Sequence, residues 1–229
     1  MKNLYLWLNL GSFIIPFVFS FHPKIQFHKR WKALLVGIAV MMLFFITWDV
    51  IFTYYGIWGF NDAYITGYKI FGLPIEEWLF FVLIPYACIF THYSLLHFFP
   101  KMAFSEKTTK IIYLVLSISL CVMGILFYTN WYTVINFAYA FVLITIAYRY
   151  QRNLLAQFLP TFIVILIPFF LINGVLTGSG IEDQVVWYNN AENLDIRMGT
   201  IPVEDTFYAM GMLLTVLLVM KMWEQKFDQ

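Results

Sequence analysis

The chain has 229 residues, of which 62% are hydrophobic and only 12% charged, with a net charge of +1 and a mean hydropathy of +0.76. About a quarter of the residues of a soluble domain are charged, so this composition excludes a soluble protein and indicates an integral membrane protein. The near-neutral charge also argues against a nucleic-acid partner, which would need a basic surface.

Seven apolar runs are long enough to cross a bilayer, because a hydrocarbon core of about 30 Å requires about 20 helical residues. The first run lacks a basic segment beyond Lys2 and a small-residue cleavage site, so we interpret it as a helix rather than a signal peptide. We therefore predict an all-α transmembrane fold with helices at residues 4–21, 33–54, 75–99, 111–128, 132–148, 155–176 and 203–221.

Charged residues are divided unevenly between the two ends of these helices. Eleven of the 14 lysines and arginines lie on one side of the predicted topology, and Lys2, Lys69 and Arg197 lie on the other. Ten of the 13 acidic residues lie at or near the side that is poor in basic residues. The positive-inside rule then predicts a multi-pass cell-membrane protein with its N-terminus outside and its C-terminus in the cytoplasm.

Two similar acidic motifs open the third and the seventh apolar runs. Residues 74–77 read Pro-Ile-Glu-Glu and residues 202–205 read Pro-Val-Glu-Asp, and aromatic residues follow each motif. Proline and acidic residues are also typical of an ordinary helix start, so one copy alone would carry little information. Carboxyl groups at the edge of a membrane helix usually face a bundle interior or a cavity, so the matched pair indicates a functional site.

The repeated motif predicts a duplicated chain. Trp58 precedes the first motif at nearly the spacing at which Trp187 precedes the second, and Asp49 has a positional counterpart in Asn173. We expect two parallel three-helix units, residues 1–105 and 131–229, joined by a linker helix in residues 106–130. A duplicated architecture usually places its site at the interface between the copies.

The paired acids suit proton chemistry. Adjacent residues lie about 100° apart around a helix, so only one acid of each pair can point directly inward. If burial and the neighbouring carboxyl group outweigh the helix dipole, a carboxylic acid keeps its proton near neutral pH and can donate it. Aromatic residues make up 21% of the chain, and their faces can stabilise a cation that has no counter-ion. Together these features suit a reaction that starts by protonating an alkene.

At this point the residues resemble those of the small integral-membrane lycopene cyclases of microbes. The resemblance rests on residues 48–49 (Trp-Asp), residues 56–60 (Gly-Ile-Trp-Gly-Phe) and the two acidic motifs in order, and it covers nearly the whole chain. In that family two homologous three-helix units occur as separate subunits or fused, and this chain resembles the fused form. The second copy has Asp205 and Asn173 where the first has Glu77 and Asp49, which leaves open whether both copies are catalytic.

The resemblance implies an enzyme of the isomerase or intramolecular lyase class that acts in carotenoid biosynthesis. An acid would protonate the terminal double bond of a linear polyene, a neighbouring alkene would close a six-membered ring, and a base would remove a proton. The expected product carries β-ionone rings, and no net redox change occurs.

Site residues follow from this mechanism. Glu76 and Glu204 are the first-choice acid/base residues, so Glu76→Gln is expected to abolish cyclisation in membranes that still contain folded protein. The remaining candidates are Glu77 and Asp205 as their pKa partners, Asp49 as a secondary acid, and Trp48, Trp58, Phe80 and Phe81 as walls of the substrate cavity.

The main alternative is a small parallel-repeat transporter with three, one and three helices. Such a transporter would need breaks and polar groups near the bilayer midplane, and Pro160 and Pro168 interrupt the sixth run, but the acids sit at one face. No nucleotide or metalloprotease motif is present, and Cys88 and Cys121 lack ligand-spaced partners, so we expect no cofactor and no metal. Lycopene and membrane lipid are the expected partners, and self-association or association with other carotenoid enzymes stays open.

Overall fold

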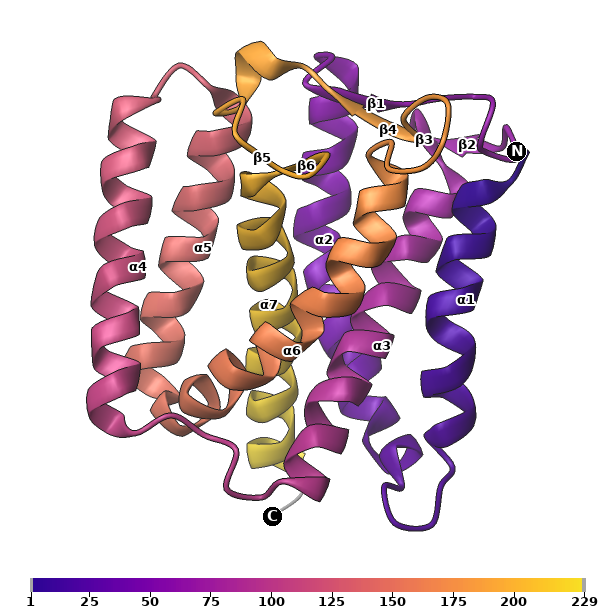
Figure 1. Ribbon diagram of the computed structural model, residues 1–229. Helices are drawn as coiled ribbons and strands as arrows, with labels where there is room; N and C mark the ends of the chain where they lie inside the picture. Colours follow the sequence, from indigo (N-terminus) through magenta and orange to yellow (C-terminus); the bar gives the residue numbers. More distant parts are fainter. Residues whose placement is uncertain (1, 228–229) are drawn as a thin grey trace.

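The computed structural model describes residues 2–227, and within them the protein is a bundle of seven α-helices with short strands at one end (Figure 1). Six of these helices are long and apolar enough to cross a membrane, and the first is a shorter apolar helix. The all-α transmembrane prediction is therefore confirmed. The helices are α1 (Leu4–Phe19), α2 (Trp31–Tyr54), α3 (Ile75–Phe98), α4 (Glu106–Leu126), α5 (Trp131–Tyr150), α6 (Arg152–Leu176) and α7 (Val203–Phe227), with 3-10 turns at Phe27–Arg30 and Asn190–Glu192.

Helices α4 and α7 depart most from their predicted bounds, with α7 ending at Phe227 instead of residue 221, and the other five agree within three residues at each end. Helix α4 starts at Glu106 instead of 111, because the hydroxyl of Ser105 accepts a hydrogen bond from the backbone N–H of Thr108 and caps the helix. The polar first turn carries no hydropathy signal. Helix α6 runs without a break through Pro160 and Pro168, so the predicted interruption is wrong. Membrane helices tolerate proline where neighbouring groups satisfy the freed carbonyls.

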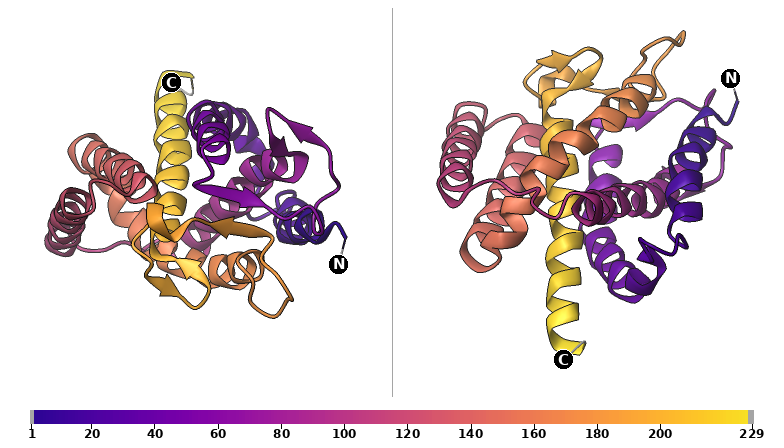
Figure 2. Two further views of the ribbon diagram at one scale, coloured as in Figure 1. Left: turned by 90° about the horizontal axis from the view of Figure 1, so that it is seen from above. Right: turned by 60° about the horizontal axis from the view of Figure 1, so that its bottom comes forward.

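Helix α7 lies at the centre of the bundle. Most of its residues are buried, and it packs extensively against both α2 and α5 (Figures 1 and 2). Helix α4 lies at the outer edge and packs mainly against α5. The core is therefore built around the helix that begins with the second acidic motif.

The two three-helix units exchange packing partners. Within each unit the first and third helices pair, α1 with α3 and α5 with α7. The middle helices cross over, because α2 packs more extensively on α7 than on α3, and α6 packs on α3. Helix α6 crosses the bundle obliquely to reach α3 (Figure 1). Any cavity between the units is consequently lined by both.

Short strands cover the end of the bundle where α3 and α7 begin. β1 (Trp58–Phe60) pairs antiparallel with β4 (Val186–Tyr188) and joins the two units. Two hairpins precede the motif helices, β2 (Lys69–Ile70) with β3 (Leu73–Pro74) and β5 (Arg197–Met198) with β6 (Ile201–Pro202). The sequence predicted only long loops here, but backbone groups that cover a buried site need hydrogen-bond partners, and the strands supply them.

The β1–β4 pairing corrects the predicted alignment of the two units. Gly59 pairs with Trp187, and Trp58 pairs with Tyr188. The second acids of the motifs, Glu77 and Asp205, lie 128 residues apart, and with this offset Trp187 corresponds to Gly59, the residue with which it pairs, and not to Trp58. The small residue is needed, because a Cβ on Gly59 would lie 2.3 Å from the Trp187 ring.

Candidate active site

Each acidic motif follows a hairpin and forms the first turn of a helix, and its first acid ties that helix to the preceding loop. The Glu76 carboxyl group accepts a hydrogen bond from the backbone N–H of Thr66 at 2.6 Å. In the second copy, Glu204 accepts one from the backbone N–H of Leu194 at 2.8 Å and one from the Thr133 hydroxyl at 2.7 Å. Both acids are fully buried. They organise loops and do not line the cavity described below.

The second acid of each motif points into the bundle and meets a tyrosine. The Tyr5 hydroxyl donates to Glu77 Oε2 at 2.5 Å, and the Tyr132 hydroxyl donates to Asp205 Oδ1. One turn further along the same helices, Asn9 and Asn136 donate to backbone carbonyls of the motifs. The second acids are thus held by matching contacts in the two units.

These tyrosines and asparagines were missed from the sequence, although a signal exists. Residues 5–9 and 132–136 share the pattern Tyr-x-x-x-Asn at a separation of 127 residues, and Glu77 and Asp205 lie 128 residues apart. A search for repeats that started from the acidic motifs and moved toward the N-terminus of each unit would have found the pattern.

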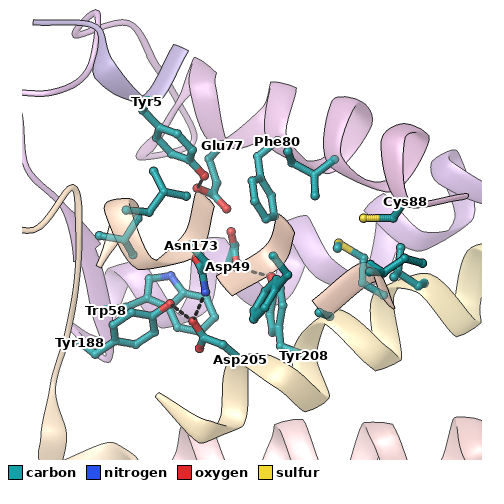
Figure 3. Close-up of a pocket in the computed structure, with 18 of the residues that line it drawn as sticks. Tyr5, Asp49, Trp58, Glu77, Phe80, Cys88, Asn173, Tyr188, Asp205 and Tyr208 are labelled. Carbon is teal, nitrogen blue, oxygen red and sulfur yellow. Dashed lines mark hydrogen bonds between the residues drawn. The ribbon is translucent and has the colours of Figure 1, made fainter. Parts of the chain in front are cut away.

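Glu77, Asp205 and Asp49 line one cavity of about 60 Å³ between the two units (Figure 3). Asp49 comes from α2, Glu77 from α3 and Asp205 from α7. Asn173 of α6 also contributes to the wall. The aromatic residues around the cavity are Tyr5, Trp58, Phe60, Phe80, Tyr132, Phe162, Phe169, Tyr188 and Tyr208.

The three acids differ in their hydrogen-bond partners. Asp205 accepts from the Tyr132 hydroxyl, from Asn173 Nδ2 at 2.8 Å and from the Tyr188 hydroxyl at 2.9 Å. Asp49 accepts only from the Tyr208 hydroxyl at 3.1 Å, and its Oδ2 is buried without a hydrogen-bond donor among residues 2–227.

Across the cavity, the Asp49 carboxyl group faces that of Glu77 (Figure 3). Asp205 is therefore surrounded by donors, whereas Asp49 and Glu77 form a carboxyl pair.

Tyr188 approaches the site from β4, outside the membrane-spanning helices. Burial and the nearby Asp205 carboxylate raise the pKa of the Tyr188 hydroxyl above its ordinary value. The hydroxyl therefore keeps its proton over the physiological pH range and remains a donor to Asp205. The sequence analysis did not identify Tyr188, because nothing in the sequence around it indicates that its hydroxyl would contact an acid.

Two of the four residues predicted to form the cavity wall line the cavity, and the other two lie behind it. Trp58 and Phe80 line it. Trp48 packs behind it against the rings of Phe45 and Tyr208, with centroid separations of 5.5 and 5.2 Å. Phe81 is fully buried and packs against Phe45 at 6.0 Å. Trp48 and Phe81 thus support the wall from outside.

In the described part of the chain, no group of three or more His, Cys, Asp or Glu side chains is placed to hold a metal ion. The family model described as lycopene cyclase matches the chain twice, over residues 2–96 and 128–223. Searches of curated proteins and of solved structures found no match. The two matched segments contain one acidic motif each, whereas the unit boundaries at residues 105 and 131 stay a prediction.

Proposed function

Because the chain belongs to the lycopene cyclase family, we propose that it closes the linear end groups of lycopene by proton-initiated cyclisation, with Asp49, Glu77 and Asp205 as the reacting carboxyl groups. The observation that carries this proposal is the joint placement of the three acids in one aromatic-walled cavity. The acids that keep the loops in place, Glu76 and Glu204, take no part in the chemistry.

The Asp49–Glu77 pair is the proton donor in this proposal. Both groups are buried and line the same cavity, and two neighbouring buried carboxyl groups cannot both be ionised at low cost, so the pair retains one proton. Within residues 2–227, the donors to the pair are the hydroxyls of Tyr5 and Tyr208. The shared proton adds to the terminal carbon–carbon double bond of the polyene and leaves a tertiary cation.

Asp205 supplies the negative charge that faces the cationic intermediate in the same cavity. Three donors stabilise its ionised form and occupy three of the about four lone-pair positions of a carboxylate. A fixed anion stabilises the cation as it forms, which is commonly the largest contribution to catalysis. The remaining lone pair can accept the proton that leaves the ring.

The atoms and electrons of this reaction balance without a cofactor. A proton enters at the terminal alkene, the π electrons of the neighbouring alkene form the ring carbon–carbon bond, and a proton leaves the adjacent carbon to restore a double bond. The product is an isomer of the substrate. Trp58, Phe80 and Tyr208 can place their faces against the intermediate, and each such contact with a cation stabilises it by about 0.5–2 kcal/mol. We infer a β-ionone ring as the product.

We also infer that the site lies near the outer face of the cell membrane. The N-terminus and both acidic motifs lie at one end of the bundle, and the C-terminal helix ends at the other (Figure 1). The basic residues are concentrated toward the end where α7 finishes, which supports a cytoplasmic C-terminus. The transporter alternative loses support, because α6 has no break at its two prolines.

Expression in cells that accumulate lycopene, followed by chromatography of the pigments, tests the proposal. The wild-type chain should convert lycopene to cyclised carotenoids, and the retention and absorption of the product identify the ring. Cells that contain the folded protein and only lycopene would refute the function. Counter-flow uptake in vesicles would then test the transporter alternative.

A further inference from the structure

A second cavity, of about 260 Å³, lies between α1, α3 and α6 and continues from the acidic cavity. Phe80, Cys88 and Phe169 line both cavities, so the two cavities adjoin. Gly11 and Pro168 line the second cavity and are exposed on the outside of the bundle. We call this second cavity the α1/α6 groove. It connects the carboxyl groups to the surface that faces lipid.

The groove has an apolar lining, and Gly11 leaves space at its opening toward the lipid. Beyond the hydrophobic residues, its walls hold only Ser12, Thr91 and Asn173 as polar side chains. The Ser12 hydroxyl bonds back to the Leu8 carbonyl at 2.8 Å and so presents no free donor. Apart from its chain neighbours and the backbone of its own helix, no described atom lies within 4 Å of a Cβ built on Gly11. The groove therefore suits a hydrocarbon chain.

The corresponding place in the second unit is filled. With the offset of 127 residues set by Tyr5/Tyr132 and Asn9/Asn136, Ser12 corresponds to Tyr139. The Tyr139 ring lies 5.3 Å from the ring of Phe45 and 6.1 Å from that of Trp48, and its hydroxyl bonds Thr215 at 2.8 Å.

The facing helices differ in the same sense. Asp49 and Asn173 align α2 with α6, so Trp48 stands where the groove has Ile172. Large aromatic side chains thus occupy in one unit the volume that smaller side chains leave open in the other. The two units therefore differ on the sides that face lipid: the first unit has an open groove there, and the described part of the second has none.

Resting on the proposed cyclase function, we propose that the polyene enters end-first from the lipid through the α1/α6 groove. The corresponding place in the second unit, between α2, α5 and α7, is closed to it. The volumes support this occupant. A cavity of about 60 Å³ holds no more than part of one end group, so the rest of the chain must occupy the groove and extend into lipid.

The test is a graded series at Gly11 with a matched series at its counterpart, Ala138, which is exposed on α5. Replacement of Gly11 by Ala, Leu and Phe should lower the initial rate of lycopene cyclisation in step with side-chain volume, reaching at least tenfold for Phe. The same replacements of Ala138 by Leu and Phe should change the rate by less than twofold. Rates are compared per mole of protein that elutes as a folded species on size exclusion.

A second variant, Ser12→Tyr, copies the residue that closes the other unit and should also reduce the rate at least tenfold. Wild-type rates throughout the Gly11 series, or equal losses in the Gly11 and Ala138 series, would overturn the entry route while leaving the cyclase function intact. A wild-type chain that makes no cyclised product would instead reject the proposed function on which this inference rests.

Discussion

The two units share their scaffold but differ in the side chains that meet the cavity. The first unit contributes Asp49 and Glu77, two carboxyl groups that face each other across the cavity, whereas the second has Asn173 and Asp205, an amide that donates to a carboxylate at 2.8 Å. Duplication alone would give two equal sites. The exchange of one acid for an amide instead gives one unit a proton to donate and the other a stable negative charge.

The same divergence extends along the helices. Tyr188 donates to Asp205, but its counterpart in the first unit is Phe60, which has no hydroxyl. Tyr208 donates to Asp49, and its counterpart, Phe80, again has none. On the proposed mechanism, the units have therefore specialised within one shared site, and each substitution below removes one of these differences or tests whether it matters.

Asp205→Asn should have the largest effect of the variants that alter this comparison. The amide keeps the shape of the side chain but removes the charge opposite the cation, so the rate should fall about 10²–10³-fold. Initial rates in membranes that contain equal amounts of folded protein measure this loss. A rate within threefold of the wild type would show that the carboxylate does not act in the reaction.

Asp49→Asn makes the first unit resemble the second. The proton shared by two carboxyl groups is then replaced by an ordinary amide–carboxylate contact, and the loss of an efficient general acid lowers a rate about 10²-fold. The steady-state rate and its pH profile should both be recorded. If the variant cyclises lycopene at the wild-type rate, Glu77 holds its proton without a partner.

Tyr188→Phe makes β4 resemble β1. Asp205 loses one of its three donors, and a hydrogen bond to a charged group contributes about 1.5–3 kcal/mol, so a rate loss of about 10- to 100-fold is expected. Thermal unfolding of the purified variant is the control, because the half-buried ring still packs at the edge of the site. An unchanged rate would argue that Tyr132 and Asn173 suffice to hold the charge.

Glu204→Gln should have the smallest effect. An amide oxygen can still accept from the Leu194 N–H and the Thr133 hydroxyl, so cyclisation should stay within threefold of the wild type. A buried amide without a full set of partners destabilises a protein by about 1–3 kcal/mol, which a lower unfolding temperature would report. Loss of activity in a variant of wild-type stability would assign Glu204 a chemical role.

Much of this fold follows from simple features of the sequence. Hydropathy located all seven helices, and the repeated motif together with Asp49 and Asn173 pointed to two related units. Hydropathy could not reveal the start of α4, where a Ser105 cap holds a polar turn, or the strand pair between the units, whose partners are 126–130 residues apart. Strand pairing across such a distance depends on the folded bundle.

The sequence could not show which acid of each adjacent pair points into the bundle. A 100° difference around a helix says that one acid faces inward but does not say which, because the answer depends on where the hairpin before Pro74 or Pro202 places the helix. Tyr5, Tyr132 and Tyr188 were overlooked as donors to the acids, and Tyr208 was noted only as an aromatic residue after the second motif, since in a chain with 15 tyrosines each one resembles an interfacial residue.

The most direct test of the central claim compares two adjacent residues, Glu76 and Glu77, each replaced by Gln in otherwise identical membranes. The cavity geometry reverses the expectation drawn from the sequence for Glu76. We predict that Glu77→Gln lowers cyclisation by about 10³-fold or more, because the pair loses its proton donor, while Glu76→Gln stays within threefold of the wild type. Full activity of Glu77→Gln with loss of activity in folded Glu76→Gln would contradict the account.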